Sequence, residues 1–128
     1  MKATIIPSSF IAVPPGCPAL TTEAPLSRNP RTIPQIEFEM LINDPYVYSS
    51  DDILYSANAE RRGISWEDYF ATVQPDFRLS PLVKRYGWGV HTNSKGKIAI
   101  YPLGSAEYEE FIRDISIQQL RGNRSFAV

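Results

Sequence analysis

The sequence is poor in the features that exported, membrane-spanning or strongly charged proteins need. Its one cysteine, Cys17, cannot form an internal disulfide, whereas small secreted domains usually carry several. No apolar run approaches the roughly 18 residues that cross a bilayer. The first residues are too interrupted by Pro7, Ser8 and Ser9 to form a signal peptide. These absences predict a soluble protein of the reducing cytoplasm.

Neither sign of charge dominates the chain. Thirteen Lys and Arg residues oppose fourteen Asp and Glu residues, which leaves a formal net charge of -1. Such a chain has no overall field that attracts nucleic acid or an anionic membrane. Its local basic clusters are Arg61-Arg62, Lys84-Arg85 and the tail positions Arg121 and Arg124. Acidic helix starts interrupt these clusters, so we expect neither nucleic acid nor a membrane as a partner.

The composition is that of one ordinary folded domain. Hydrophobic residues make up 43% and charged residues 21% of the 128 positions, far from the balance of a disordered chain. A chain of this length buries one core. Proline is frequent in residues 14–32, where apolar periodicity is weak, and the last residues are basic. We therefore expect a single domain, 1–128, with a proline-rich loop at about 14–32 and a loose basic tail at about 121–128.

Helix signals follow the proline-rich loop. Thr32 can cap a helix over 33–43, and Pro34 suits its first turn. Further caps and apolar spacings predict a helix from Ser50 to Arg62 that Gly63 ends, and another from Trp66 to about Val73. A short helix is expected after Ser80-Pro81. A last helix is expected after Ser105, and its apolar stripe could extend through Leu120.

Strand signals lie at the beginning of the chain and after the fourth helix. Residues 9–13 are short and β-branched, and proline follows them. Residues 88–92 and 97–101 alternate in polarity around the polar turn 93–96, which predicts a β-hairpin. The expected fold is α+β, with a small antiparallel sheet made of the N-terminal strand and the hairpin at about 88–101, covered by four or five helices.

Three blocks of sequence form a pattern that extends over most of the chain. They are residues 10–13 with Cys17-Pro18, residues 38–41 with 44–48 and 50–52, and residues 80–82 with 84–91 and 96–101. With the Arg-Tyr-Gly-Trp-Gly-x-His run at 85–91, this pattern resembles that of a family of small, mostly bacterial proteins of unknown function. The resemblance implies a cytoplasmic single-domain protein and no particular activity. Gly16 stands where the family has an acidic residue, which argues against acid-assisted thiol chemistry at Cys17.

The segment 84–91 offers the best candidate ligand-binding residues, namely Arg85, Tyr86, Trp88 and His91. Arginine can fork onto a carboxylate or phosphate, the aromatic rings are flat amphipathic surfaces, and histidine changes charge near neutral pH. Plain packing competes with this interpretation. Trp88 shares a strand face with Val90, so it is expected to anchor the core, while His91 on the opposite face is expected to be exposed.

Other reactive residues have simpler structural explanations. Asp51 and Asp52 complement a helix dipole better than they form a catalytic pair. Cys17 is the candidate redox residue, but it has no nearby second cysteine. We find no catalytic motif, and we expect neither a cofactor nor a metal site. The function we expect is a non-catalytic binding or interaction module for a small molecule or protein, and the alternative is a small enzyme or redox protein that uses Cys17 and His91.

Overall fold

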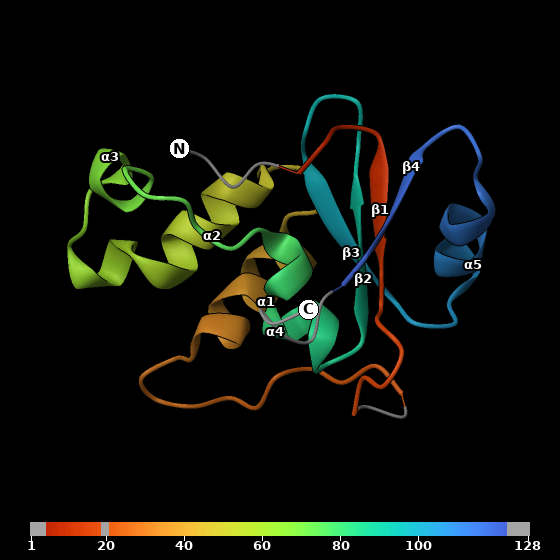
Figure 1. Cartoon of the computed structure of the whole chain (residues 1–128). Helices are drawn as coiled ribbons and strands as arrows, with labels where there is room; N and C mark the ends of the chain where they lie inside the picture. The colour runs from red at the N-terminus through yellow and green to blue at the C-terminus, as the bar shows by residue number, and fades with distance from the viewer. Residues whose placement is uncertain (1–4, 19–20, 123–128) are drawn as a thin grey trace.

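A mixed four-stranded sheet divides the protein into two unequal layers of helices (Figure 1). The computed structural model describes residues 5–18 and 21–122. The sheet has the order β3-β2-β1-β4, and only β4 runs parallel to its neighbour β1. The strands are β1 (Ser9–Ala12), β2 (Trp88–Thr92), β3 (Ile98–Pro102) and β4 (Gln118–Arg121).

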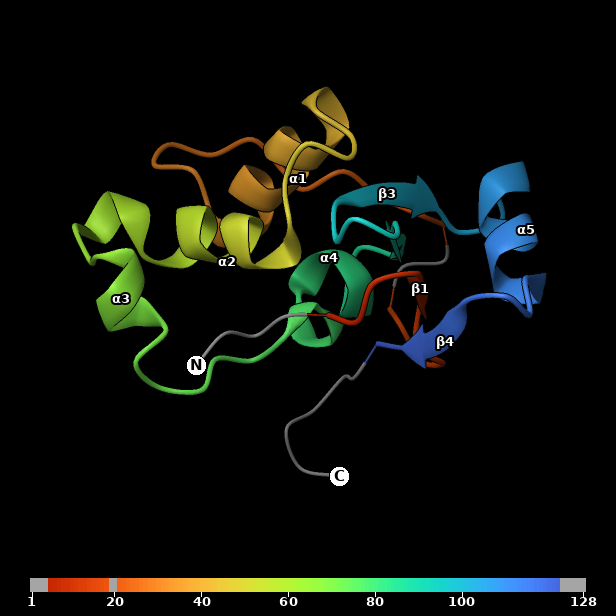
Figure 2. The ribbon, with the colours of Figure 1, turned by 90° about the horizontal axis from the view of Figure 1, so that it is seen from above.

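Most of the helices cover one face of this sheet, and one helix covers the other face (Figures 1 and 2). The first group contains α1 (Ile33–Asn43), α2 (Ser50–Asn58), α3 (Trp66–Tyr69), α4 (Pro81–Lys84) and the 3-10 turns Glu60–Arg62 and Phe77–Leu79. Helix α5 (Ala106–Arg113) lies alone on the opposite face. This arrangement confirms the α+β class. No helix within the described ranges is both long and apolar enough to span a membrane.

The core between the sheet and the main helical layer contains the expected hairpin residues. Val90 pairs with Ile100, and Trp88 lies on the same strand face. All three side chains are buried, and they pack with Ile98, Leu41 and Phe77 among others. The expected apolar layer on this face of the hairpin is therefore confirmed.

The first two helices lie where the capping and turn residues of the sequence predicted them. Helix α1 spans the expected residues, and the Thr32 side chain accepts a hydrogen bond from the Gln35 N–H. The helix expected from Ser50 to Arg62 is α2 followed by the 3-10 turn Glu60–Arg62, and it ends at Gly63 in the left-handed region. The cap of α2 is Ser49, which forms a capping box with Asp52.

The third helix is shorter than expected and ends at Tyr69 instead of about Val73. In a continued helix, the Tyr69 carbonyl would accept a hydrogen bond from the N–H of Val73. That carbonyl instead accepts a hydrogen bond from the Gln74 side chain at 2.7 Å. The Val73 side chain is consequently exposed and does not join the core.

The expected extension of the last helix through Leu120 is wrong. Helix α5 ends at Arg113, and residues 118–121 pair with β1 as strand β4. The Asp114 carboxylate accepts hydrogen bonds from both the N–H and the hydroxyl of Ser116, which favours a turn over another helical turn. Ile115 is 100% exposed. Arg121, expected to begin a loose tail, is the last residue of β4, and residues 123–128 lie outside the described part.

The second face of the sheet is packed tightly against α5. The ring of Phe10 makes an edge contact with Tyr108 and a stacked contact with Phe111, at centroid distances of 5.1 and 5.2 Å. Gly89 lies beneath these rings, and a Cβ atom at this position would come within 2.5 Å of Phe10 and 2.6 Å of Tyr108. The absence of a side chain at Gly89 therefore permits the close packing of β2 against Phe10 and Tyr108.

Gly89→Ala is expected to destabilise the protein by about 1–3 kcal/mol, because buried rings must move to admit the methyl group. Chemical denaturation of the two proteins measures this difference. In a double-mutant cycle, Phe10→Leu should lessen the cost of the alanine, because the Phe10 ring is its nearest neighbour. Additive effects of the two substitutions would contradict the proposed clash.

Candidate functional site

A pocket of about 480 Å³ opens within the main helical layer. Residues from α1, α2, the segment around α3, and α4 line it. Its polar side chains include Glu37, Asn58, Arg62, Asp68, Tyr69 and Ser80. Polar groups from several elements therefore converge on one concave site, which is the usual form of a small-molecule site.

Glu37 is the most unusual residue of this pocket. It projects from α1 and is only 1% exposed. The Ser80 hydroxyl donates a hydrogen bond of 2.7 Å to its Oε1 atom. Burial raises the pKa of Glu37 from its ordinary value of 4.5 to about 7, although the Ser80 hydrogen bond acts in the opposite direction. The carboxyl group therefore changes charge near neutral pH.

Ser80 connects this carboxyl group to the beginning of α4. Its hydroxyl oxygen accepts a hydrogen bond from the Leu82 N–H while the hydroxyl proton is donated to Glu37. The serine that caps α4 thereby also fixes the position of the Glu37 side chain. Two helices that are distant in sequence are joined at the floor of the pocket.

Further charges act across the same pocket. Burial raises the pKa of the Tyr69 phenol, and the negative charges of Glu37 and Asp51 raise it further, whereas Arg62 lowers it. Asp51, on α2, is itself only 4% exposed. Buried carboxyl groups from α1 and α2 and one guanidinium group therefore share an electrostatic environment. Such a setting favours ligands that bring positive charge to the floor of the pocket.

The structure places three of the four expected binding residues in one region. Arg85 is exposed at the end of α4, and Tyr86 beside it is partly buried. Trp88 is 8% exposed and packs in the core, while its Nε1–H donates a hydrogen bond of 2.8 Å to the Glu23 carbonyl. The proline-rich loop is thus tied to the segment that contains these three residues.

His91 lies on the opposite face of the sheet, under α5. Its ring stacks on Phe111 at a centroid distance of 4.1 Å. Its Nδ1 atom is 2.8 Å from the Tyr46 hydroxyl, which is also 2.8 Å from the Tyr101 hydroxyl. Tyr46 has a φ of 60°, so its backbone is in the left-handed region. His91 is therefore partly buried, contrary to its expected exposure, because α5 covers it.

Cys17 and His91 lie toward different ends of the sheet. Phe10 is opposite His91 and Ile11 is opposite Val90, so the chain that leaves β1 runs past the Trp88 end of β2. Cys17 follows that end, and it is partly buried. The ring contacts of His91 are instead with Tyr46 and Phe111. This arrangement gives no support to chemistry shared between the thiol and the imidazole.

The surroundings of His91 lower the pKa of its imidazole below the ordinary value of 6.5. Burial lowers the pKa of the imidazole, and the negative charge of Asp114 only partly offsets this effect. Because this is the single histidine of the chain, NMR can follow its titration without overlap. We expect a midpoint below the ordinary value of 6.5 and an increase toward it in Phe111→Ala, which uncovers the ring. A midpoint that does not change in this variant would contradict the role assigned to α5.

Comparison with known proteins identifies the family. A family of unknown function (DUF6157) has a model that matches residues 1–127. The chain belongs to this family. The match confirms the expected membership of a family of unknown function, and it indicates no catalytic or redox activity. No significant match was found among curated proteins or among solved structures.

In this member of DUF6157, the pocket around Glu37 was not among the sites predicted from the sequence. A signal for it is nevertheless present in α1, where Ile33, Ile36 and Met40 follow helical spacing. Glu37 occupies a position of that same apolar stripe, four residues after Ile33. A carboxylate on the apolar side of a helix is rarely buried without a reason. The signal identifies the residue, but it does not identify the α3 and α4 residues that complete the pocket.

The described residues of this member of DUF6157 offer no set of ligands for a metal ion. Within residues 5–18 and 21–122, no group of three His, Cys, Asp or Glu residues is arranged to hold a metal ion.

Proposed function

We propose that this protein is a binding module for a small polar molecule that places a positively charged nitrogen against Glu37. The observation that carries the proposal is a buried carboxyl group on the floor of an open pocket. Among the described residues, Glu37 accepts a hydrogen bond from Ser80 but forms no ion pair. An ionised buried carboxylate is costly without a countercharge, and a cationic ligand would supply one.

The dimensions and the rim of the pocket support a ligand of this kind. A volume of about 480 Å³ is within the range of small-molecule sites. Arg62 and Asp68 line the same pocket, and neither forms an ion pair of 4.0 Å or less with a described residue. These side chains can bind polar groups elsewhere on the ligand. The resulting arrangement recognises a molecule with a basic end and additional hydrogen-bonding groups.

Binding of a cation should be coupled to release of a proton. Glu37 is partly protonated near pH 7, and a positive ligand favours its ionised form. The Ser80 hydroxyl donates a hydrogen bond to it, and the Tyr69 phenol responds to its charge as well as to the charges of Arg62 and Asp51. Of these, the pKa of Tyr69 is raised above its ordinary value of 10.0, so Tyr69 stays neutral between pH 6 and pH 8. Affinity for the cation should therefore rise from pH 6 to pH 8.

Thermal unfolding with small cations tests the proposal. The probes are benzamidine and benzylamine, and their neutral counterparts are benzamide and benzyl alcohol. A cation should cause a saturable increase in Tm at pH 8 and a smaller one at pH 6, whereas the neutral compounds should not. A ligand present at 100 times its Kd stabilises the folded state by about 2.7 kcal/mol, which is easily measured.

Two substitutions on α1 provide the matched controls. Glu37→Gln should abolish the increase in Tm because it removes the charge and keeps the shape. Glu39→Gln removes the same charge from a partly exposed position on the same helix and should leave the increase unchanged. An increase that persists in Glu37→Gln, or the absence of a saturable response to both cations, contradicts the proposal.

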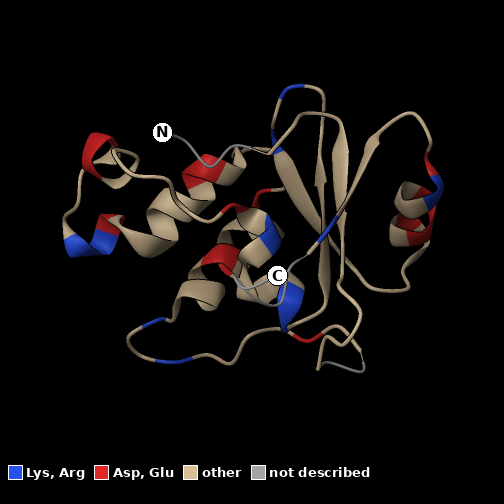
Figure 3. Cartoon of the chain, viewed as in Figure 1, with Lys and Arg blue, Asp and Glu red and all other residues tan. Residues whose placement is uncertain are grey.

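The wider setting of the protein is part of the proposal. We place the binding module in the reducing cytoplasm of a bacterium, because Cys17 is a free thiol and the sequence pattern resembles a mostly bacterial family. A role in nucleic-acid binding is not proposed. Among the described residues, Lys and Arg are dispersed over separate elements and do not follow one continuous stripe (Figure 3). A small-molecule partner therefore agrees better with the distribution of charge.

A further inference from the structure

A second concave region lies beside the proline-rich loop and shares Pro81 with the pocket around Glu37. It consists of two adjoining hollows of about 380 and 440 Å³. Both hollows are lined by Leu26, Arg85 and Tyr86, so they form one groove between the loop and the end of α4. We refer to this region as the loop groove.

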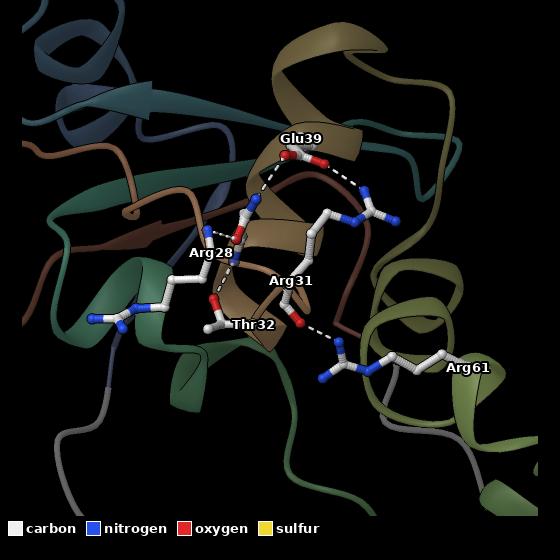
Figure 4. Close-up of polar contacts among 6 residues, drawn as sticks. Arg28, Arg31, Thr32, Glu39 and Arg61 are labelled. Carbon is white, nitrogen blue, oxygen red and sulfur yellow. Dashed lines mark hydrogen bonds and ion pairs between the residues drawn. The ribbon is translucent and has the colours of Figure 1, made fainter.

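Two arginine residues line the smaller hollow of the loop groove. Arg28 comes from the loop and Arg85 from the end of α4. In the part of the chain that the structure describes, neither side chain has a hydrogen-bond or ion-pair partner, whereas Arg31 and Arg78 are paired with Glu39 and Asp76. Figure 4 shows the guanidinium of Arg28 directed away from the network that connects Arg31 and Glu39.

No carboxylate is found among the described residues that line the smaller hollow, whereas Glu23 lines the larger one. Two positive groups that line one hollow attract an anion, because its charge interacts favourably with both. Guanidinium groups bind carboxylate and phosphate oxygens through paired N–H donors. The ring of Tyr86 adds a flat surface beside them.

Hydrogen bonds hold the loop in the shape that forms the groove. The Glu23 N–H donates to the Tyr86 carbonyl at 2.9 Å, and the Glu23 carbonyl accepts from Trp88 Nε1 at 2.8 Å. At the other end, the Arg28 N–H donates to Gln35 Oε1 at 3.0 Å. The groove is therefore formed before any ligand arrives, which reduces the entropy cost of binding.

We infer that the loop groove is an oxyanion site, in which Arg28 and Arg85 bind the carboxylate or phosphate group of a small molecule. This site is separate from the one proposed around Glu37, and it goes beyond that function. The arginines supply the charge, Tyr86 contacts the body of the ligand, and Trp88 holds the loop in position through its N–H group. Arg85 and Tyr86 were candidate binding residues from the sequence, whereas Arg28 joins them only through the fold.

NMR titration of the arginine side chains tests this inference. The probes are phenyl phosphate and benzoate, added at constant ionic strength, with sodium chloride as the reference. The Nε–Hε signals of Arg28 and Arg85 should shift and saturate with at least one probe. Tighter binding of phenyl phosphate identifies a phosphate site, and tighter binding of benzoate identifies a carboxylate site. Shifts that stay linear, as with chloride, overturn the inference.

Substitutions test whether the probes bind in the loop groove. Arg85→Gln and Arg28→Gln should each weaken binding by roughly tenfold or more, because each removes a charge-assisted pair of hydrogen bonds. Arg113→Gln removes the same charge from α5 and should not change the Kd. An unchanged Kd in Arg85→Gln, or equal weakening in Arg113→Gln, overturns the inference. Glu37→Gln should bind the probes normally, so failure of this site and failure of the cation site remain distinguishable.

Discussion

Glu37→Gln is expected to raise the free energy of unfolding by about 3 kcal/mol at pH 8. The folded protein holds this carboxyl group in a buried position where its pKa is about 7, compared with an ordinary value of 4.5. Above pH 7 the fold must therefore contain an ionised group with almost no access to water. Glutamine has the same shape, can accept the hydrogen bond from Ser80, and carries no charge.

The pH dependence of this effect has a definite sign. Between pH 4.5 and pH 7 the folded state binds more protons at Glu37 than the unfolded state does. The contribution of Glu37 to stability therefore falls as the pH rises, by about 1.4 kcal/mol per pH unit. It is complete below pH 4.5 and is lost above pH 7, so the gain from Glu37→Gln should disappear in acid.

Urea unfolding at pH 5 and pH 8 measures this effect. Glu39→Gln is the control, because Glu39 lies on the same helix, is partly exposed, and pairs with Arg31. Its hydrogen bonds with Arg31 and Gln35 lower the pKa of Glu39, so this control should not stabilise the protein at pH 8. Equal stabilities of Glu37→Gln and the unsubstituted protein at pH 8 would show that Glu37 is not held in a desolvated state.

Trp88→Ala is expected to lower the free energy of unfolding by about 3–5 kcal/mol. The ring is 8% exposed, packs against Phe38 at a centroid distance of 5.4 Å, and belongs to the core layer with Val90 and Ile100. Alanine would leave a cavity at this position and would also release the loop that Trp88 Nε1 holds. Chemical denaturation measures the loss, and a variant with full stability would contradict the core role.

Trp88→Phe separates packing from the hydrogen bond. Phenylalanine keeps most of the ring but cannot donate to the Glu23 carbonyl. We expect a smaller loss of stability than in Trp88→Ala, together with weaker binding of oxyanion probes in the loop groove. Normal binding by a folded Trp88→Phe protein would show that the N–H group does not support the groove.

Local chemistry in the sequence determined much of the secondary structure. The Thr32 cap and Pro34 predicted α1 correctly, because both act within one helical turn of the residues they influence. The hairpin was also predictable, since alternation and turn chemistry are local properties. The same alternation placed Trp88 and Val90 on one buried face. These predictions succeeded where the decisive interaction joins residues that are close along the chain.

The end of the last helix could not be predicted in this way. Apolar spacing continued beyond Arg113, but Asp114 and Ser116 turn the chain. Strand β4 forms because residues 118–121 find a free edge at β1, more than one hundred positions earlier in the chain. Pairing between segments so distant has no counterpart in local periodicity. The packing of α5 that partly buries His91 was missed for the same reason.

The division between sequence and tertiary structure is clearest at the two proposed sites. The sequence by itself determined that Arg85, Tyr86 and Trp88 are neighbours, and that Glu37 interrupts an apolar stripe. Only the fold brings Arg28 to the hollow that Arg85 lines, and only the fold encloses Glu37 against Ser80. Charge and hydrogen-bonding capacity belong to individual residues, whereas burial and convergence depend on segments that meet after folding.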